Sequence, residues 1–303
     1  MGLVYYKEPE LEKPLLMASW PGIGNIGLMA VDTLRSLLGA EYFAEIEPAE
    51  FFYPRRVIIR GGELKDMEFP GSRFYYKRLK ERDLILFVGE EQPAEGGRAY
   101  AEGTKAYQMA NLVLDLAVRF GCSRVYTSGA AVTTIHHSVI PRVWAVPNTG
   151  HLLSEVKRLG NTVVMSEIEE RGGQGSITGL NGLLLGVARK RGLDAICLMG
   201  EIPIYLQGLP FPYPKASKSV LEVLAAAAGI SVDTRSMDEL ISRSESEIGR
   251  LFESFPSEVR EQIDKLRKLT DTRQAETGPI TEEDKKKILE DIDKMFKQEP
   301  KGE

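Results

Sequence analysis

The sequence predicts an α/β fold in which helices cover both faces of a mixed, mostly parallel sheet, followed by a helical appendage at the C-terminal end. Strand-like and helix-like segments alternate over residues 1–233, which is the pattern of a layered sheet between helices. The apolar run at 83–89 is typical of a strand buried on both faces of a parallel sheet. Beyond residue 233 the strand signals stop, and charged amphipathic helical patterns replace them.

The first strand and the first helix of the core flank a glycine-rich turn. The apolar run 15–20 is predicted as the strand and 28–38 as the helix. The turn between them reads Trp-Pro-Gly-Ile-Gly-Asn-Ile-Gly. A strand, a glycine-rich turn and a helix in this order direct backbone N–H groups and a helix N-terminus at one point. We therefore take four residues of this turn as candidate ligand-binding residues: Gly22, Gly24, Asn25 and Gly27.

The spacing of the three glycines in this turn also matches the dinucleotide-binding fingerprint, Gly-x-Gly-x-x-Gly. Glu47 stands where that fingerprint places its ribose-binding acid, about 20 residues further on. However, Pro21 precedes the first glycine and Pro48 directly follows Glu47, and both fit such a motif poorly. A dinucleotide-binding enzyme is therefore the least favoured of the functional hypotheses.

The next segment is predicted to make the sheet mixed. Residues 41–47 are predicted as a strand, and the β-branched centre of 55–60 predicts another. A Gly-Gly dipeptide then turns the chain, and 68–76 is predicted to return as the antiparallel partner of 55–60. The buried strand 83–89 follows and ends in Gly-Glu-Glu-Gln-Pro.

The rest of the core alternates helices with strands in the same way. Helical spacing of apolar residues and a closing glycine, Gly121, predict a long helix over 103–120. A second glycine-rich turn, at 172–182, leads into a helix at 183–190, which Gly192 ends. The remaining elements are strands at 124–129, 143–146, 162–165 and 195–199 and helices at 151–159 and 216–228.

The charged C-terminal part divides the chain into a core domain, 1–233, and a helical extension, 234–303. Helices are predicted over 237–255 and from Ser257 onward, and a polar linker at about 271–279 leads to a last helix. The apolar stripes of these helices are expected to pack on the protein's own core rather than on a partner.

Composition excludes several classes of protein. A net charge of −5 without a basic excess argues against a nucleic-acid-binding protein. The longest apolar run is well short of the ~20 residues of a membrane-spanning helix. The N-terminus lacks the pattern of a signal peptide, and Cys122 and Cys197 are expected to be buried thiols in a reducing compartment. We therefore expect a cytoplasmic protein with no nucleic-acid or membrane partner.

Further candidate ligand-binding residues follow the ends of predicted strands, since ligands of open α/β sheets bind beyond the carboxyl ends of the strands. The candidates are Glu90, Glu91, Ser128, Gly129 and Glu201, joined by Gly179 and Asn181 of the second glycine-rich turn. Two carboxylates near two helix N-termini suit a sugar hydroxyl, an amine, a metal or acid–base chemistry. The alternative is that the glutamates cap backbone amides and the glycines permit tight turns and close packing.

No catalytic or metal-binding motif is complete in the sequence. The three histidines show no zinc-ligand spacing, and the adjacent His136 and His137 are expected to point in opposite directions. Walker A and Gly-x-Ser-x-Gly sequences do not occur. Ser128 has no convincing base near it in the sequence. We therefore predict no catalytic residue, no metal site and no cofactor.

Three motifs carry a family resemblance: the turn at 20–27, Gly-Glu-Glu-Gln-Pro at 89–93, and Ile-Thr-Gly-Leu-Asn-Gly-Leu-Leu-Leu-Gly at 177–186. Together they resemble the proteasome assembly chaperone family, in particular the type-two chaperone and its archaeal and bacterial relatives. The resemblance covers about 15–233 and implies a three-layer α/β/α fold similar to nucleoside phosphorylases and peptidyl-tRNA hydrolases. It also implies self-association and, for some members, binding to proteasome subunits.

The resemblance favours a non-catalytic, homo-oligomeric protein that acts on the assembly of other proteins. Some members dock on the proteasome through a hydrophobic-Tyr-X tail, whereas this sequence ends in Lys301-Gly302-Glu303, so docking by that route is not expected. The expected partner is the proteasome or another protein assembly. The alternative is an enzyme or sensor that binds a nucleoside- or phosphate-like molecule at the carboxyl edge of the sheet.

Overall fold

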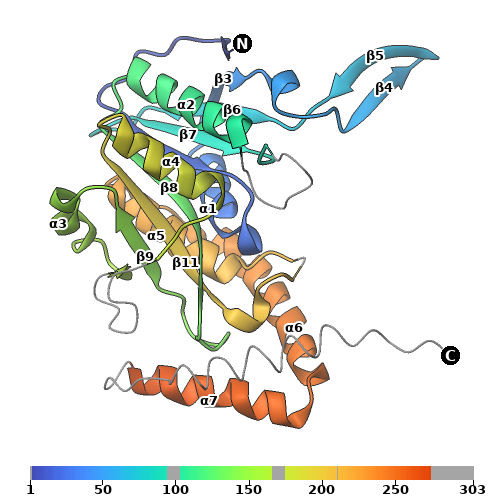
Figure 1. Ribbon diagram of the computed structural model, residues 1–303, viewed down its shortest axis with the longest axis vertical. Coiled ribbons are helices and arrows are strands. Elements are labelled where there is room, and N and C mark those ends of the chain that lie inside the picture. The colour runs from blue at the N-terminus through green and yellow to red at the C-terminus, as the bar shows by residue number, and fades with distance from the viewer. Residues whose placement is uncertain (1, 94–102, 166–174, 210, 274–303) are drawn as a thin grey trace.

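The computed structural model describes residues 2–93, 103–165, 175–209 and 211–273 of the 303-residue chain (Figure 1). Within these residues nine strands form one sheet in the order β1-β3-β6-β7-β2-β8-β11-β9-β10. Their bounds are β1 Leu3–Tyr5, β2 Leu15–Ser19, β3 Glu41–Ile46, β6 Ser72–Lys77, β7 Leu84–Gly89, β8 Arg124–Thr133, β9 Val143–Pro147, β10 Thr162–Val164 and β11 Ala195–Pro203.

The middle of the sheet is parallel and its flanks contain antiparallel pairs. β2 pairs in parallel with both β7 and β8, and β8 pairs in parallel with β11. β6 runs antiparallel to β7, and β9 runs antiparallel to β11. The carboxyl ends of the parallel strands therefore lie along one edge, which is where an open α/β sheet places its ligands.

Helices cover both faces of this sheet, which confirms the predicted three-layer α/β/α fold (Figure 1). One face carries α1 and α5, which pack against each other, and the other face carries α2 and α4, which do the same. The bounds are α1 Ile26–Leu37, α2 Gly103–Arg119, α4 Gly179–Lys190 and α5 Pro214–Ala227.

The apolar residues of β2 contribute to the hydrophobic cores on both faces of the sheet. Leu15 and Met17 belong to the core beneath α1 and α5, whereas Leu16 and Ala18 belong to the core beneath α2 and α4. Successive side chains of a strand point to opposite faces of the sheet. A strand between two helical layers therefore needs apolar residues at consecutive positions, and this is why its sequence does not alternate with polar residues.

Two helices end just before the glycines that were predicted to end them. Gly121 and Gly192 follow α2 and α4 with φ angles of 64° and 69°, a left-handed conformation that glycine adopts without strain. The helix predicted at 151–159 is much shorter, because α3 covers only Leu153–Val156 after a 3₁₀ turn.

The strand pairing predicted across the Gly-Gly dipeptide is wrong in its second strand. β4 (Arg56–Arg60) pairs with β5 (Glu63–Glu68) in a separate two-stranded sheet, and β6 instead joins the main sheet between β3 and β7. Gly61 and Gly62 both have positive φ, as a two-residue hairpin turn requires, so the chain reverses at once and β5 starts directly after them.

The C-terminal helices pack on the core, as their apolar stripes predict. α6 covers Asp238–Ser254 and α7 covers Ser257–Arg273. The core beneath α1 and α5 includes the following residues from this part of the chain: Met237, Ile248, Phe255, Val259, Ile263 and Leu266. The linker predicted at 271–279 thus begins within α7, and its remainder and the helix predicted beyond it lie outside the described residues. The division of the chain at residue 233 stays a prediction.

The loop after β8 lies beneath these two helices. His136 and His137 stack with ring centroids 4.0 Å apart rather than pointing in opposite directions. The hydrogen bond from Val139 N to His136 O places them in a turn instead of an extended segment. Phe252 of α6 contacts both rings, and Asp264 of α7 lies 3.9 Å from Nε2 of His136. The pair of imidazoles therefore contacts both C-terminal helices in addition to the apolar residues that attach them.

We expect this loop to make stability depend on pH. Burial of His137, beside the charges of His136 and Lys215, lowers its pKa to about 4, although Glu245 and Asp264 act in the opposite direction. In the unfolded chain a histidine has a pKa of about 6.5, so between pH 6.5 and pH 4 the unfolded state binds a proton that the folded state excludes. The free energy of unfolding should therefore fall as pH is lowered through this window, by about 2 kcal/mol at most.

Urea unfolding at pH 7.5, 6 and 5 measures this effect when the protein is compared with its His137→Gln variant. The substitution should flatten the pH dependence between pH 6.5 and 4, whatever it does to stability at neutral pH, because glutamine does not titrate. An identical slope in both proteins would contradict the assignment.

Candidate functional site

The carboxyl ends of the central strands border a cavity of about 260 Å³. Three predicted candidates, Gly22, Gly129 and Asn181, line it. Further lining residues come from β8, β9 and β11, from the segment after β7 and from the segment before α4, among them Gln92, Trp144, Thr178, Cys197 and Met199. The edge of the sheet that the sequence pointed to is therefore hollowed.

The first glycine-rich turn is held in shape by its own backbone. Gly24 and Asn25 have φ angles of 60° and 49°, so both are left-handed. The N–H of Asn25 donates to the carbonyl of Gly22 at 2.9 Å, and the carbonyl of Gly24 accepts from the N–H of Tyr213 at 2.8 Å. These groups bind other parts of the same chain, and the Asn25 side chain is exposed.

Gly27 lets α1 lie directly against β8. A Cβ atom on this residue would stand 2.3 Å from the carbonyl oxygen of Ser128 and 2.8 Å from the N atom of Gly129. Ser128 itself is fully buried, and its hydroxyl has no hydrogen-bond partner among the described residues. The contact explains the third glycine of the motif by close packing, and a buried serine without a base is not an activated nucleophile.

The second glycine-rich turn is bonded to the first through Asn181. Its Oδ1 accepts from the N–H of Trp20 at 3.2 Å and from the hydroxyl of Thr127 at 3.4 Å, and its Nδ2 donates to the carbonyl of Trp20 at 3.4 Å. Asn181 is 6% exposed. One buried amide therefore satisfies both backbone groups of the residue that enters the first turn, and Gly179 begins the helix that carries it.

Gln92 is a site residue that the candidate set omitted. Its Nε2 donates to the carbonyl of Pro21, and its Oε1 accepts from the N–H of Leu180 at 2.9 Å. The three motifs at 20–27, 89–93 and 177–186 are therefore connected by side-chain hydrogen bonds. Gln92 stands within the second motif, next to the two carboxylates, so its place in the motif is the sequence signal for it.

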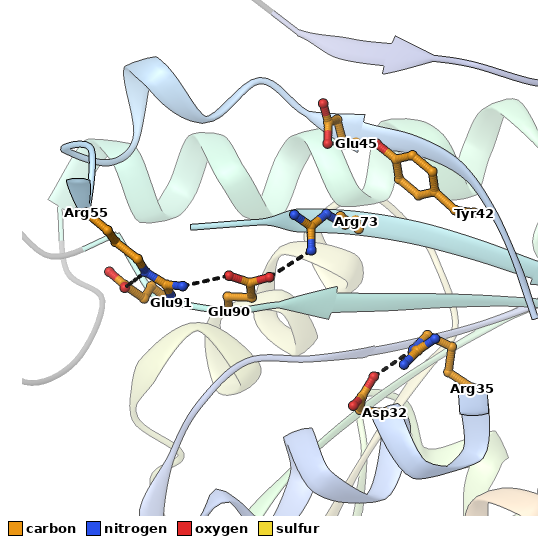
Figure 2. Close-up of polar contacts among 8 residues, drawn as sticks. All are labelled: Asp32, Arg35, Tyr42, Glu45, Arg55, Arg73, Glu90 and Glu91. Carbon is orange, nitrogen blue, oxygen red and sulfur yellow. Dashed lines mark hydrogen bonds and ion pairs between the residues drawn. The ribbon is translucent and has the colours of Figure 1, made fainter. Parts of the chain in front are cut away.

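Glu90 and Glu91 face arginines instead of the cavity. Figure 2 shows Arg55 reaching both carboxylates, with Nη1 at 2.9 Å from Glu90 and Nε at 2.8 Å from Glu91. Arg73 of β6 adds a second contact to Glu90 at 2.8 Å. The hydrogen bond that Arg55 donates to Glu91 is the main cause that raises the pKa of Arg55. Neither glutamate lines the cavity described above, so both are committed to holding β4 and β6 at the end of β7.

Glu201 lies inside a strand rather than after one, because β11 continues to Pro203. It is 1% exposed. Its Oε1 accepts from Nη2 of Arg142 at 3.0 Å and from Nε1 of Trp144 at 2.9 Å, and its Oε2 accepts from the backbone N–H of Arg142 at 2.9 Å. Protein donors thus occupy both carboxylate oxygens, and the residue fixes β9 against β11.

The remaining chemistry at this edge is limited. Burial raises the pKa of Cys197 to about 12, so the thiol that lines the cavity stays protonated at neutral pH. No group of three or more His, Cys, Asp or Glu side chains in the described part of the chain is arranged to hold a metal ion. The polar side chains that line the cavity include Gln92, Thr178 and Asn181. Those of Gln92 and Asn181 already bind backbone groups of the same chain, and no carboxylate is among the described lining residues.

Within the described residues, no helix is both long and apolar enough to cross a bilayer.

Comparison with known proteins supplies the family. The PAC2 family profile matches residues 16–251. An uncharacterized protein of Methanocaldococcus jannaschii is 28% identical over 90% of this chain and 92% of its own length. PbaB of Pyrococcus furiosus, described as an archaeal proteasome activator, is 28% identical, with a TM-score of 0.68 over 82% of this chain and 97% of that one.

A second solved structure, PbaA of Pyrococcus furiosus, is described as an archaeal homolog of proteasome-assembly chaperone. It is 20% identical, with a TM-score of 0.60 over 87% of this chain and 98% of that one, and supports the fold. The matched region covers more than half of the chain and contains all three motifs and the α/β core from β2 onward, so this chain belongs to the PAC2 family.

Proposed function

We propose that this protein is a non-catalytic, homo-oligomeric protein of the cytoplasm that binds other proteins and assists their assembly. The observation that carries the proposal is that polar residues around the candidate site are bonded within the chain itself. Asn181, Gln92, Glu90 and Glu201 bind backbone groups and arginines of the same chain. A catalytic site instead keeps its acids and nucleophiles free to reach a substrate.

The proteasome is the first partner to test. A protein that is 28% identical over most of this chain is described as an archaeal proteasome activator. The fold is also that of a homolog of proteasome-assembly chaperone. These similarities support a partner that is a multi-subunit protein complex. The proposal therefore includes the proteasome and other multi-subunit assemblies.

Affinity purification of the tagged full chain from its native host, after mild cross-linking, tests this function. Mass spectrometry should recover proteasome subunits, or the subunits of one other defined assembly, above the level of a tag-only control. Native mass spectrometry of the purified protein gives its subunit number. Recovery of the bait alone, in a preparation where known proteasome contacts survive, would contradict the proposal.

A second candidate function rests on the cavity of about 260 Å³ at the carboxyl edge of the sheet, lined by Gln92, Thr178 and Asn181. The Thr178 hydroxyl and the Trp144 ring on its lining suit a small nucleoside- or phosphate-like molecule, although Gln92 and Asn181 are bonded to the chain itself. Thermal-shift measurements with nucleosides, nucleotides and inorganic phosphate test this function, since a ligand at 100 times its Kd stabilises a protein by roughly 2.7 kcal/mol. No shift with any of these compounds would exclude it.

A further inference from the structure

A second cavity lies at the opposite edge of the sheet, where the parallel strands begin. Its volume is about 640 Å³, which lies in the range of roughly 300–1,000 Å³ that is typical of small-molecule sites. Its walls come from the segments that enter β7, β2 and β8, from α3 and the segment after it, and from the end of α5. Six charged residues line it: Lys13, Glu81, Arg82, Arg124, Glu155 and Arg158.

Three of the cations meet here because each stands where a parallel strand begins. Lys13 is two residues before β2, Arg82 is two residues before β7, and Arg124 is the first residue of β8. The amino ends of parallel strands lie at one edge of a sheet, and β2 lies between β7 and β8. Neighbouring strands are about 4.8 Å apart, so cations that are distant in the sequence enter the same small region.

The backbone that carries these cations is fixed by hydrogen bonds between the entry segments. The N–H of Ser123 donates to the carbonyl of Pro14 at 2.9 Å, and the Ser123 hydroxyl donates to the carbonyl of Lys13 at 3.3 Å. The N–H of Asp83 donates to the carbonyl of Glu12 at 3.3 Å, and the Asp83 carboxylate accepts from the N–H of Glu12 at 2.7 Å. The cavity is therefore pre-organised, which lowers the entropic cost of binding a ligand.

Arg124 is a mostly buried cation on the wall of this cavity, with a side chain that is 18% exposed. Its Nη1 lies 3.0 Å from Oε2 of Glu155, and its Nη2 lies 3.8 Å from Oδ2 of Asp194. Its Nε is buried and has no hydrogen-bond partner among the described residues. A buried N–H group without an acceptor costs free energy, so this guanidinium retains a donor that an oxygen atom of a ligand would satisfy.

The charges of the cavity are not balanced. Four cations and two carboxylates leave a net charge of +2. One of these carboxylates, Glu155, is already paired with Arg124. The side chains of the other three cations, Lys13, Arg82 and Arg158, form no hydrogen bond or ion pair within the described part of the chain. Cations that converge without partners repel one another and attract an anion to the space between them.

We propose that this cavity binds the phosphate group of a small phosphorylated molecule. Guanidinium groups bind phosphate through paired hydrogen bonds. A phosphate monoester carries close to two negative charges at neutral pH, because its second pKa is about 6, and this matches the excess positive charge. None of the described lining residues is aromatic, so recognition depends on the phosphate and not on a stacked base. The site shares no lining residue with the cavity at the carboxyl edge and does not depend on the proposed function.

Arg82 and Arg158 are the residues to change, because both are exposed and removal of their charges should leave the fold intact. The double variant Arg82→Gln with Arg158→Gln removes two positive charges from the cavity. We expect it to weaken the binding of glycerol phosphate, a small phosphate monoester, at least about tenfold, because two charged contacts to the phosphate are lost.

The matched control removes the same charge from another place. Arg243→Gln with Arg250→Gln changes two exposed arginines of α6. α6 contacts the first turn of α5 through the ion pair of Glu245 with Lys215, whereas the cavity lies at the other end of α5. The length of that helix, about 20 Å, separates the two places, which is more than a Debye length at physiological salt. We expect the control to change the affinity less than about twofold.

Isothermal titration calorimetry of the three full-length proteins at pH 7.5 and constant ionic strength measures these affinities, and circular dichroism verifies that each protein is folded. Glycerol phosphate is the main probe. Inorganic phosphate distinguishes a free anion from an ester, and both should bind. Succinate, which carries two carboxylates, tests the chemical class and should bind more weakly than glycerol phosphate.

Four results would overturn the inference. If neither phosphate binds the wild type at concentrations up to about 10 mM, the cations only offset the carbonyl groups at the end of α5. Equal weakening by both double variants would assign the binding to the overall charge. Binding that the cavity variant leaves unchanged would place the phosphate elsewhere and favour the cavity at the carboxyl edge. Tighter binding of succinate would exclude phosphate as the preferred class. The affinity purification tests the assembly function independently of all four.

Discussion

Replacement of Gly27 by alanine is expected to lower the free energy of unfolding by about 3 kcal/mol. The new Cβ would stand 2.3 Å from the carbonyl oxygen of Ser128, a backbone atom in the middle of the sheet. Because neither the strand nor the helix has free space nearby, α1 must move away from β8 and its contacts in the core loosen. A loss of about 3 kcal/mol is a large share of the 5–15 kcal/mol by which a typical domain is stable against unfolding.

Gly22→Ala is the matched control for this prediction, because it makes the same substitution in the same turn. Gly22 has an extended backbone, with φ of −161°, and a Cβ added there meets no atom within 4 Å. Its unfolding free energy should stay within about 0.5 kcal/mol of the wild type. Urea denaturation followed by tryptophan fluorescence compares the variants, and equal stability of Gly27→Ala and wild type would refute the packing argument.

Arg142→Met should lower the free energy of unfolding by about 2–3 kcal/mol. This loss is at or below the low end of the range measured when one partner of a buried ion pair is removed, because Arg142 is half-exposed. The side chain of Arg142 is 49% exposed while that of Glu201 is 2% exposed. Without the guanidinium the carboxylate keeps only Trp144 Nε1 and one backbone N–H as donors. A nearly uncompensated charge then remains between β9 and β11.

Two further variants test the cause of this loss. In the double variant Arg142→Met with Glu201→Gln the buried charge is absent and the amide oxygen accepts from Trp144, while the amide nitrogen faces the backbone N–H of residue 142. Part of the lost stability should therefore return. Arg243→Met removes an equivalent arginine from an exposed pair with Glu239, whose side chains are 70% and 75% exposed. That control should cost less than about 0.5 kcal/mol. If both single arginine variants lose the same stability, burial of Glu201 is not the cause.

Much of the fold follows from local patterns in the sequence. The apolar runs at 15–20 and 83–89 became β2 and β7, because a strand between two helical layers has no solvent-facing position. Gly121 and Gly192 marked the ends of α2 and α4 because a helix often ends at a residue with positive φ, which glycine adopts without strain. This preference depends only on the local backbone. The predicted partner of β4 was wrong because strand pairing depends on segments that are distant in sequence. β6 pairs with β3 and β7 in the main sheet instead.

The sequence indicated the edge of the sheet at which the cavity lies, but not the contacts of the candidate residues. Gly22, Gly129 and Asn181 line the cavity at the carboxyl edge. Glu90 and Glu91 looked like free carboxylates because Arg55 and Arg73 are distant from them in sequence, and only the assembled sheet brings these charges together. Glu201 looked like a strand-end residue because β11 continues four residues beyond its apolar run. Its partner Arg142 is the residue just before β9 and lies far from Glu201 in the sequence.

The sequence by itself determined the layered α/β class, the three motifs and the edge of the sheet at which they meet. These properties depend on period, on turn chemistry and on the rule that parallel strands end together. The tertiary structure alone decided what the motifs do: Gly27 admits the backbone of β8, Asn181 holds Trp20, and Glu90 binds Arg55 at the base of the hairpin of β4 and β5. The physical reason is that hydrogen bonds, ion pairs and close packing act between residues that only folding makes neighbours.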